Sequence, residues 1–286
     1  MSGDGTEYKP AWSPDGQWIA YVTWDSSGTG NIFKTRADGS GSPQKLTNTP
    51  AFYTDVAFTT DGSRIVARRG NALMRSQVDS EFGGLRIPLD LVWLPAGGGD
   101  VTMIVPARGL GTPHFGPESD RVYFYSGSGG LLSMRYDGTD RRTHLRFTGR
   151  PVPGAPQPPS ADEARISPDG NWAVAQNSYQ LFLTVVPKVG GDAPSINLYG
   201  PSVPAVQITD IGADSYSWTP DSKFITWVVG STFFRRSVDS VQLEPPKPEE
   251  KKPDAATEKK DEPKKDEAKK DEPKKEEPKK IGRAHV

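Results

Sequence analysis

Trp12-Ser13-Pro14-Asp15-Gly16, followed by the apolar run WIAYV, is the first of five related stretches in this chain of 286 residues. Each has an aromatic or aliphatic anchor, a short turn and then an apolar run. The other four are Phe58-Thr59-Thr60-Asp61-Gly62 before RIVAR, Phe115-Gly116-Pro117-Glu118-Ser119 before RVYFY, Ile166-Ser167-Pro168-Asp169-Gly170 before WAVAQ, and Trp218-Thr219-Pro220-Asp221-Ser222 before FITWV. The chain therefore contains an internal repeat.

The period of this repeat indicates the architecture. Successive anchors are 46, 57, 51 and 52 residues apart, close to the ~40–50 residues of a four-stranded propeller blade. The turn suits an antiparallel connection. Proline presets φ at the first central position, aspartate favours the bridge conformation that follows, and glycine tolerates the backbone geometry at the exit. The sequence predicts an all-β propeller of about five visible four-stranded blades, in either a complete or an incomplete ring, with an ordinary β-sandwich as the alternative.

The remaining strands of a blade are legible in the first repeat and in the third, which reads LLSMRYDGTDRRTHLRF. NIFKTRADGSG predicts a strand and a turn at Asp38-Gly39, and QKLT predicts a short outer strand. With 30 glycines, 27 prolines and no long helical period, helix should be scarce. We expect the propeller over residues 1–243, and its predicted blades occupy roughly 7–50, 51–107, 108–150, 160–210 and 211–243.

Composition excludes several classes of function. The chain has no cysteine, so it has neither disulfides nor thiolate metal sites. Its net charge of −1 argues against nucleic acid as a partner. No run reaches the ~20 apolar residues of a membrane span, so we expect no membrane insertion, and the start lacks the features of a signal peptide.

Residues 244–280 differ from the rest of the chain. They hold thirteen lysines, thirteen acidic residues and seven prolines, so their charges cancel and no core can form. Proline interrupts any helix that i,i+4 ion pairs would favour. The segment is predicted to be a disordered, charged linker, and an interaction tail is the alternative.

Both ends of the chain invite an interpretation. The last six residues, 281–286 (IGRAHV), match a translated sequencing adapter, so we interpret them as an artefact and give His285 no functional weight; a genuine terminus is the alternative. The start reads as part of a blade already in progress, which predicts a further blade before it. A cytoplasmic protein that begins at Met1 is the alternative.

The repeat resembles the TolB-type, WD40-like propeller repeat, PD40. Longer strings, among them LVWLPAGGGDVTMIVPA, LLSMRYDGTDRRTHLRFTG and ARISPDGNWAVAQ, resemble the propeller half of bacterial propeller–amidohydrolase fusion proteins. The resemblance covers roughly residues 7–240. It implies a periplasmic or extracellular location and a divalent metal in a following hydrolase domain.

No catalytic site is predicted in this chain itself. Only His114 and His144 fall in the expected fold, without the H-x-H pair of an amidohydrolase cage, so we expect no metal and no cofactor here. Nucleophile-elbow, phosphate-loop and dinucleotide motifs are missing. The repeat residues are expected to be structural: Pro14, Asp15, Gly16, Asp61, Gly62, Pro117, Pro168, Asp169, Gly170, Pro220 and Asp221.

One set of positions is a candidate binding site. The residues one and three before each anchor should share a face of the innermost strands. They are Ala11, Lys9, Ala57, Asp55, His114, Thr112, Arg165, Glu163, Ser217 and Ser215. If this face borders the channel mouth, then Lys9, Asp55, His114, Glu163 and Arg165 would form a polar funnel for a peptide end, a sugar or a cation. A wet channel with no ligand is the alternative.

Three functions are consistent with these expectations. The first is a non-catalytic accessory propeller of a larger exported amidohydrolase, with the missing C-terminal hydrolase domain or another protein as its partner. The second is a free-standing binding propeller resembling TolB. The third is the gating propeller of a prolyl-oligopeptidase-like peptidase.

Overall fold

The computed structural model describes residues 6–76, 89–106 and 110–243. The predicted linker at 244–280, the segment 281–286, Met1 and part of the second predicted blade lie outside these residues. The regular secondary structure of the described residues is almost entirely β, as predicted. Its short helices are α1 (Ala72–Ser76) and the 3₁₀ turns η1 (Gly127–Gly129) and η2 (Val238–Ser240).

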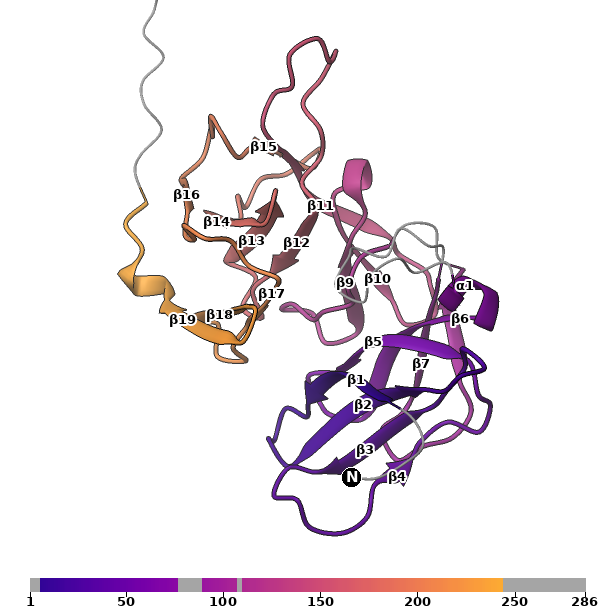
Figure 1. The fold of residues 1–286 in the computed structure, drawn as a ribbon. Coiled ribbons are helices and arrows are strands. Elements are labelled where there is room, and N and C mark those ends of the chain that lie inside the picture. The colour runs from indigo at the N-terminus through magenta and orange to yellow at the C-terminus, as the bar shows by residue number, and fades with distance from the viewer. Residues whose placement is uncertain (1–5, 77–88, 107–109, 244–286) are drawn as a thin grey trace, which may run out of the picture. The chain divides into compact units, whose positions relative to one another are not determined.

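The fold is a five-bladed β-propeller (Figure 1). The first sheet holds β1 (Thr6–Trp12), β2 (Trp18–Trp24), β3 (Ile32–Arg36) and β4 (Gln44–Lys45), and the second holds β5 (Phe52–Phe58), β6 (Arg64–Gly70), β7 (Asp90–Pro95) and β8 (Thr102–Val105). Both are antiparallel and follow chain order.

The other three sheets depart from this plan in different ways. The third holds β9 (Arg121–Tyr125), β10 (Leu131–Arg135), β11 (Arg142–Thr148) and β15 (Ser195–Asn197). The fourth holds β12 (Glu163–Ile166), β13 (Trp172–Asn177), β14 (Gln180–Val185) and β16 (Ala205–Gln207). The fifth has, among the described residues, the three strands β17 (Ser215–Trp218), β18 (Phe224–Val229) and β19 (Thr232–Ser237).

The sequence did not predict that a strand from the range of the fourth blade would join the third sheet. β15 lies inside the range expected for the fourth blade, yet it pairs in parallel with β11 of the third sheet. The reason is burial: Ile196 and Leu198 are 1% and 4% exposed in the apolar cluster between these two sheets. The innermost position of the third sheet is a single bridge between His114 and Tyr123.

The repeated turn has the same hydrogen bonds in four repeats. In the second repeat, Asp61 Oδ1 accepts from Thr59 Oγ1 and from the Ser63 backbone N–H, while Thr59 Oγ1 accepts from the Arg64 N–H. The fifth residue of the turn has a φ between 60° and 71° at Gly16, Gly62, Gly170 and Ser222. The third repeat is different, because Glu118 bonds to Arg142 instead.

Four apolar clusters join consecutive sheets, from the first to the fifth. The repeat anchors lie in them, so that each anchor packs against the sheet that precedes its own: Phe58, Phe115, Ile166 and Trp218. Trp12 is the exception and is 61% exposed. Among the described residues, none of the four clusters combines the fifth sheet with the first. The incomplete ring therefore stays a prediction.

The turn carboxylates should contribute measurably to stability. Asp61→Ala removes three hydrogen bonds to a carboxylate, and should lower the free energy of unfolding by about 1–3 kcal/mol. Thr59 and then Ser63 lower the pKa of Asp61 to about 2. The loss should therefore be complete above pH 4 and should fade as the pH falls through 2.

Urea unfolding of both proteins across this pH range measures the effect. Asp120→Ala is the matched control, because Asp120 is exposed and its ion pair among the described residues is with the exposed Arg135, and it should change stability by less than about 1 kcal/mol. Equal effects of the two substitutions would contradict the structural role of the turn.

Two anchors at the same repeat position test whether the first sheet is covered. Phe58 is 7% exposed and Trp12 is 61% exposed. Phe58→Ala should cost about 3–5 kcal/mol of unfolding free energy, whereas Trp12→Ala should cost less than about 1 kcal/mol. Chemical denaturation measures both. An equally large loss for Trp12→Ala would mean that another surface buries Trp12 in solution.

Candidate polar site at the inner strands

The candidate residues lie on or beside the inner strands β1, β5 and β12 of their sheets (Figure 1). β1 and β5 contact each other, and β12 contacts β9. β1 and β5 each contain a β-bulge, at Lys9 and at Asp55, where φ is 51° and 50°. A left-handed conformation is uncommon outside glycine, and it is retained where the surroundings impose it. The bulges redirect these two side chains.

Asp55 is the centre of a buried ion-pair network. The Nε and Nη2 groups of Arg68 both donate to Asp55 Oδ2, and Lys9 Nζ lies 3.7 Å from Asp55 Oδ1. Asp55 and Arg68 are 7% and 4% exposed. Burial alone raises the pKa of Asp55, but the charges of Arg68 and Lys9 outweigh it and lower the pKa below its usual range. Asp55 is therefore ionised and structural.

Arg68 was missed by the sequence analysis. Its Nη1 donates to the Leu110 backbone oxygen at 2.8 Å, which ties the second sheet to the segment before the third. The available signal was a charged residue directly after the apolar run IVA of β6. Counting back from the anchors selects only inner-strand positions, so it did not find a residue on β6.

Glu163 lies on β12 against a glycine. A Cβ atom added to Gly111 would lie 2.5 Å from Glu163 Oε2, so the carboxyl occupies the space that a side chain there would fill. Glu163 Oε1 is buried without a hydrogen-bond partner. Burial raises the pKa of Glu163 to about 7, against the opposing charges of Arg165 and Arg68. This carboxyl changes its charge near neutral pH.

Arg165 lies two residues further along the same face of β12. Its Nη1 donates to the backbone oxygen of Tyr216, and its guanidinium carbon is 4.7 Å from the centroid of the Tyr216 ring. Its Nε is buried and has no hydrogen-bond partner. The edge of the guanidinium formed by Nε and Nη2 is therefore the one that does not bond to the Tyr216 oxygen.

His114 is held as a neutral bridge between segments. Its Nε2 accepts from the Ile166 N–H at 3.2 Å, so Nδ1 carries the proton and donates to the Thr112 oxygen at 3.2 Å. Burial, and then the charge of Arg165, lower the pKa of His114 to about 3. Both ring nitrogens are occupied, which leaves no lone pair for a metal.

The predicted set is thus only partly brought together. Lys9 and Asp55 form an ion pair, while Glu163, Arg165 and His114 interact across the next two sheets. Ala11 instead packs on the apolar cluster between the first two sheets. Ser215 and Ser217 are exposed, and β17 contributes the backbone of Tyr216 in their place. Among the described residues, no group of three or more histidine, cysteine, aspartate or glutamate side chains could hold a metal ion.

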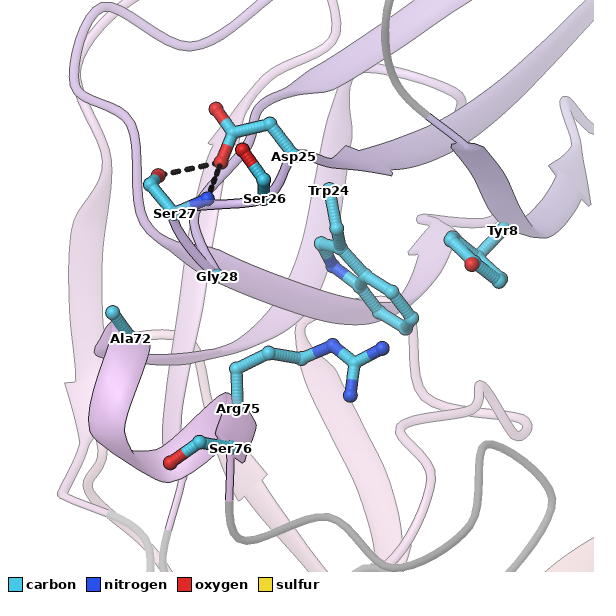
Figure 2. Close-up of a pocket in the computed structure, with 9 residues that line it drawn as sticks. All are labelled: Tyr8, Trp24, Asp25, Ser26, Ser27, Gly28, Ala72, Arg75 and Ser76. Atoms are coloured by element: carbon cyan, nitrogen blue, oxygen red, sulfur yellow. Dashed lines mark hydrogen bonds between the residues drawn. The ribbon is translucent and has the colours of Figure 1, made fainter.

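A second candidate is a pocket of about 480 Å³ beside β1 and α1 (Figure 2). The Tyr8 and Trp24 rings are stacked with their centroids 4.1 Å apart, and the Arg75 guanidinium carbon lies 4.4 Å from the centroid of the Trp24 ring. Trp24 is only 7% exposed, and its Nε1 donates to the Tyr53 oxygen. Asp25, which also lines the pocket, accepts from Ser27 within its own turn. The aromatic ring is thus largely covered, and the polar groups named here satisfy local bonds.

His144 belongs to an internal network. Its Nε2 lies 2.7 Å from Ser133 Oγ, which accepts from Arg121 Nε at 2.9 Å. This Ser–His pair has the geometry of a nucleophile and base. However, Ser133 and Arg121 are both completely buried, so the serine is out of reach of a substrate and the network is structural.

Comparison with known proteins shows the fold. No family model matches the chain, and no curated protein matches it. The putative TolB of Agrobacterium tumefaciens is 17% identical over 86% of this chain and 82% of its own, with a TM-score of 0.55. TolB of Acinetobacter baumannii is 14% identical over 84% of this chain and 53% of its own, with a TM-score of 0.54.

An oligogalacturonate lyase from Vibrio parahaemolyticus is similar at a lower level, with a TM-score of 0.47 and 14% identity over 79% of this chain and 75% of its own. At these identities the similarity to TolB establishes a shared β-propeller fold. No helix among the described residues is long and apolar enough to cross a membrane.

The pH dependence of stability should reveal Glu163. Between its usual pKa of 4.5 and its folded pKa of about 7, the folded chain holds a proton that the unfolded chain has lost. The free energy of unfolding should therefore decrease as the pH rises through this window. Glu163→Gln should remove this decrease and should be the more stable protein above pH 7.

Urea unfolding from pH 4 to pH 8 measures the difference between the two proteins, in which the titration of His114 cancels. Glu7→Gln, on an exposed side chain, controls for the change in net charge. Parallel stability curves for the wild type and Glu163→Gln would show that Glu163 is not buried in a protonated form.

Proposed function

We propose that this chain is a non-catalytic interaction propeller, and that it serves as the accessory domain of a larger exported metal-dependent hydrolase of the amidohydrolase class. The observation that carries the proposal is the polar centre at the inner strands. It combines two left-handed non-glycine residues, Lys9 and Asp55, with buried atoms of Glu163 and Arg165 that have no partner.

Such a centre is costly to fold. An unsatisfied buried polar group costs about 1–3 kcal/mol, and each left-handed residue adds about 1–3 kcal/mol of strain. A propeller can fill its centre with apolar side chains instead, as the neighbouring sheets do between their faces. We infer that the polar centre is kept because it binds something.

The catalytic role is assigned to another domain. The described residues contain no candidate metal cage, and the Ser133–His144 pair is buried. In the proposed protein, the charged segment 244–280 leads to a hydrolase domain that carries the divalent metal, and the propeller is its protein partner. The resemblance and the shared fold of the TolB structures support a bacterial envelope location.

Two other functions remain as alternatives. A free-standing binding propeller, resembling TolB, is favoured by the shared fold alone. The gating propeller of a prolyl-oligopeptidase-like peptidase is compatible with a polar channel mouth. Both are interaction functions. The free-standing propeller would precede no catalytic domain, and the gating propeller would precede a peptidase domain in place of the amidohydrolase domain.

Long-read sequencing of the source DNA past the codon for Lys280 tests the proposal. We expect the frame to continue into a barrel domain with an H-x-H motif. A G-x-S-x-G domain there would favour the gating propeller. A stop codon after Val286 would overturn the accessory role and favour the free-standing one. If the barrel is found, calorimetric titration of the separate domain with this chain measures their contact.

A further inference from the structure

The geometry points to a ligand for the polar centre: we propose that Arg165 and Glu163 bind a free carboxylate, such as the C-terminal end of a peptide, together with one proton that Glu163 takes up. The inference rests on the proposed interaction function and names its chemistry. It is carried by two unpartnered atoms, Arg165 Nε and Glu163 Oε1, on one face of β12.

Arg165 presents the edge that a carboxylate fits. Its Nη1 is engaged by the Tyr216 oxygen, and the Tyr216 ring packs against the guanidinium. This fixes the plane of the group and leaves the edge of Nε and Nη2. Two parallel N–H donors at that edge match the two oxygens of a carboxylate, and such bidentate pairs are among the strongest hydrogen bonds in proteins.

Glu163 decides when this site accepts an anion. Residues two apart on a strand face the same side and are about 6–7 Å apart along it, so a carboxylate on Arg165 is also near Glu163. An ionised Glu163 would repel it, whereas a protonated Glu163 donates its O–H to one ligand oxygen. Protonation thus converts repulsion into a hydrogen bond and satisfies Oε1.

The charges around Glu163 favour an anionic ligand, whereas burial, and not these charges, keeps Glu163 protonated. The groups that act on it are Arg165 on its own strand, Arg68 and Asp55 of the second sheet, the Thr112 backbone N–H, and the Tyr125 and Tyr216 side chains. Lys9 joins them through Asp55. With Glu163 protonated, Lys9, Arg68 and Arg165 exceed Asp55 by two positive charges. The centre then attracts an anion.

Isothermal titration calorimetry of the full chain with N-acetyl-triglycine tests the proposal, since this peptide ends in a free carboxylate. Its C-terminal amide is the matched control, and acetate distinguishes a peptide end from any small carboxylate. We expect the acid to bind and the amide not to bind. Above pH 7, affinity should weaken about tenfold per pH unit, because one proton is taken up with the ligand.

Two variants separate the roles of the residues. Glu163→Gln keeps a donor that does not titrate, so it should bind the acid with little dependence on pH. Arg165→Lys loses the bidentate edge and should bind at least about tenfold more weakly. Arg146→Lys is the control, because Arg146 is exposed on β11 and bonds to Ala193, and it should bind like the wild type.

Several results would overturn the inference: equal binding of acid and amide, no binding of the acid by the wild type, unchanged binding by Arg165→Lys, or the same pH dependence in Glu163→Gln as in the wild type. If Arg165→Lys does not fold by circular dichroism, the pH profile of Glu163→Gln still decides. Failure here with intact binding to the downstream domain would leave the proposed function standing.

Discussion

The packing of each sheet against the one before it is the constraint on which the rest of this propeller depends. A four-stranded sheet cannot bury both faces by itself, so each repeat after the first places its anchor against the preceding sheet. Phe58 and Ile166 are almost completely buried at such interfaces, whereas Trp12, at the same repeat position, is exposed. An anchor at this repeat position is thus buried where a preceding sheet covers it, and it is exposed where none does.

The repeated turn serves this packing and not a reaction. Its aspartate accepts hydrogen bonds from the serine or threonine two residues earlier and from a backbone N–H two residues later. These bonds fix the direction in which the chain enters the second strand of each sheet. The five acids repeated in the sequence therefore lie in five separate turns: the four aspartates bond within their own turns, and Glu118 bonds to Arg142.

The polar centre differs from the repeated turns, because some of its buried groups have no hydrogen-bond partner. Asp55 and Arg68 satisfy one another, and His114 is neutral with both nitrogens bonded. Glu163 and Arg165 keep buried atoms without partners in the same neighbourhood. Some polar groups of the centre thus have all their hydrogen-bond partners, whereas those on β12 do not. This difference supports a binding role for β12.

The sequence by itself determined the repeat, the all-β class and the five blades, because an anchor, a turn and an alternating apolar strand are local features with a fixed period. It also pointed to Lys9, Asp55, His114, Glu163 and Arg165 by counting back from the anchors. Counting assumes that side chains alternate regularly along a strand, and the bulges at Lys9 and Asp55 break this alternation.

Only the tertiary structure decided which distant segments contact one another. Arg68 reaches Asp55 and Leu110 from a neighbouring strand and a distant loop, and β15 leaves its own repeat to bury Ile196 and Leu198 in the third interface. These contacts join residues that no local pattern links, because they depend on which surfaces the folded sheets bring together, and that is a property of packing rather than of spacing.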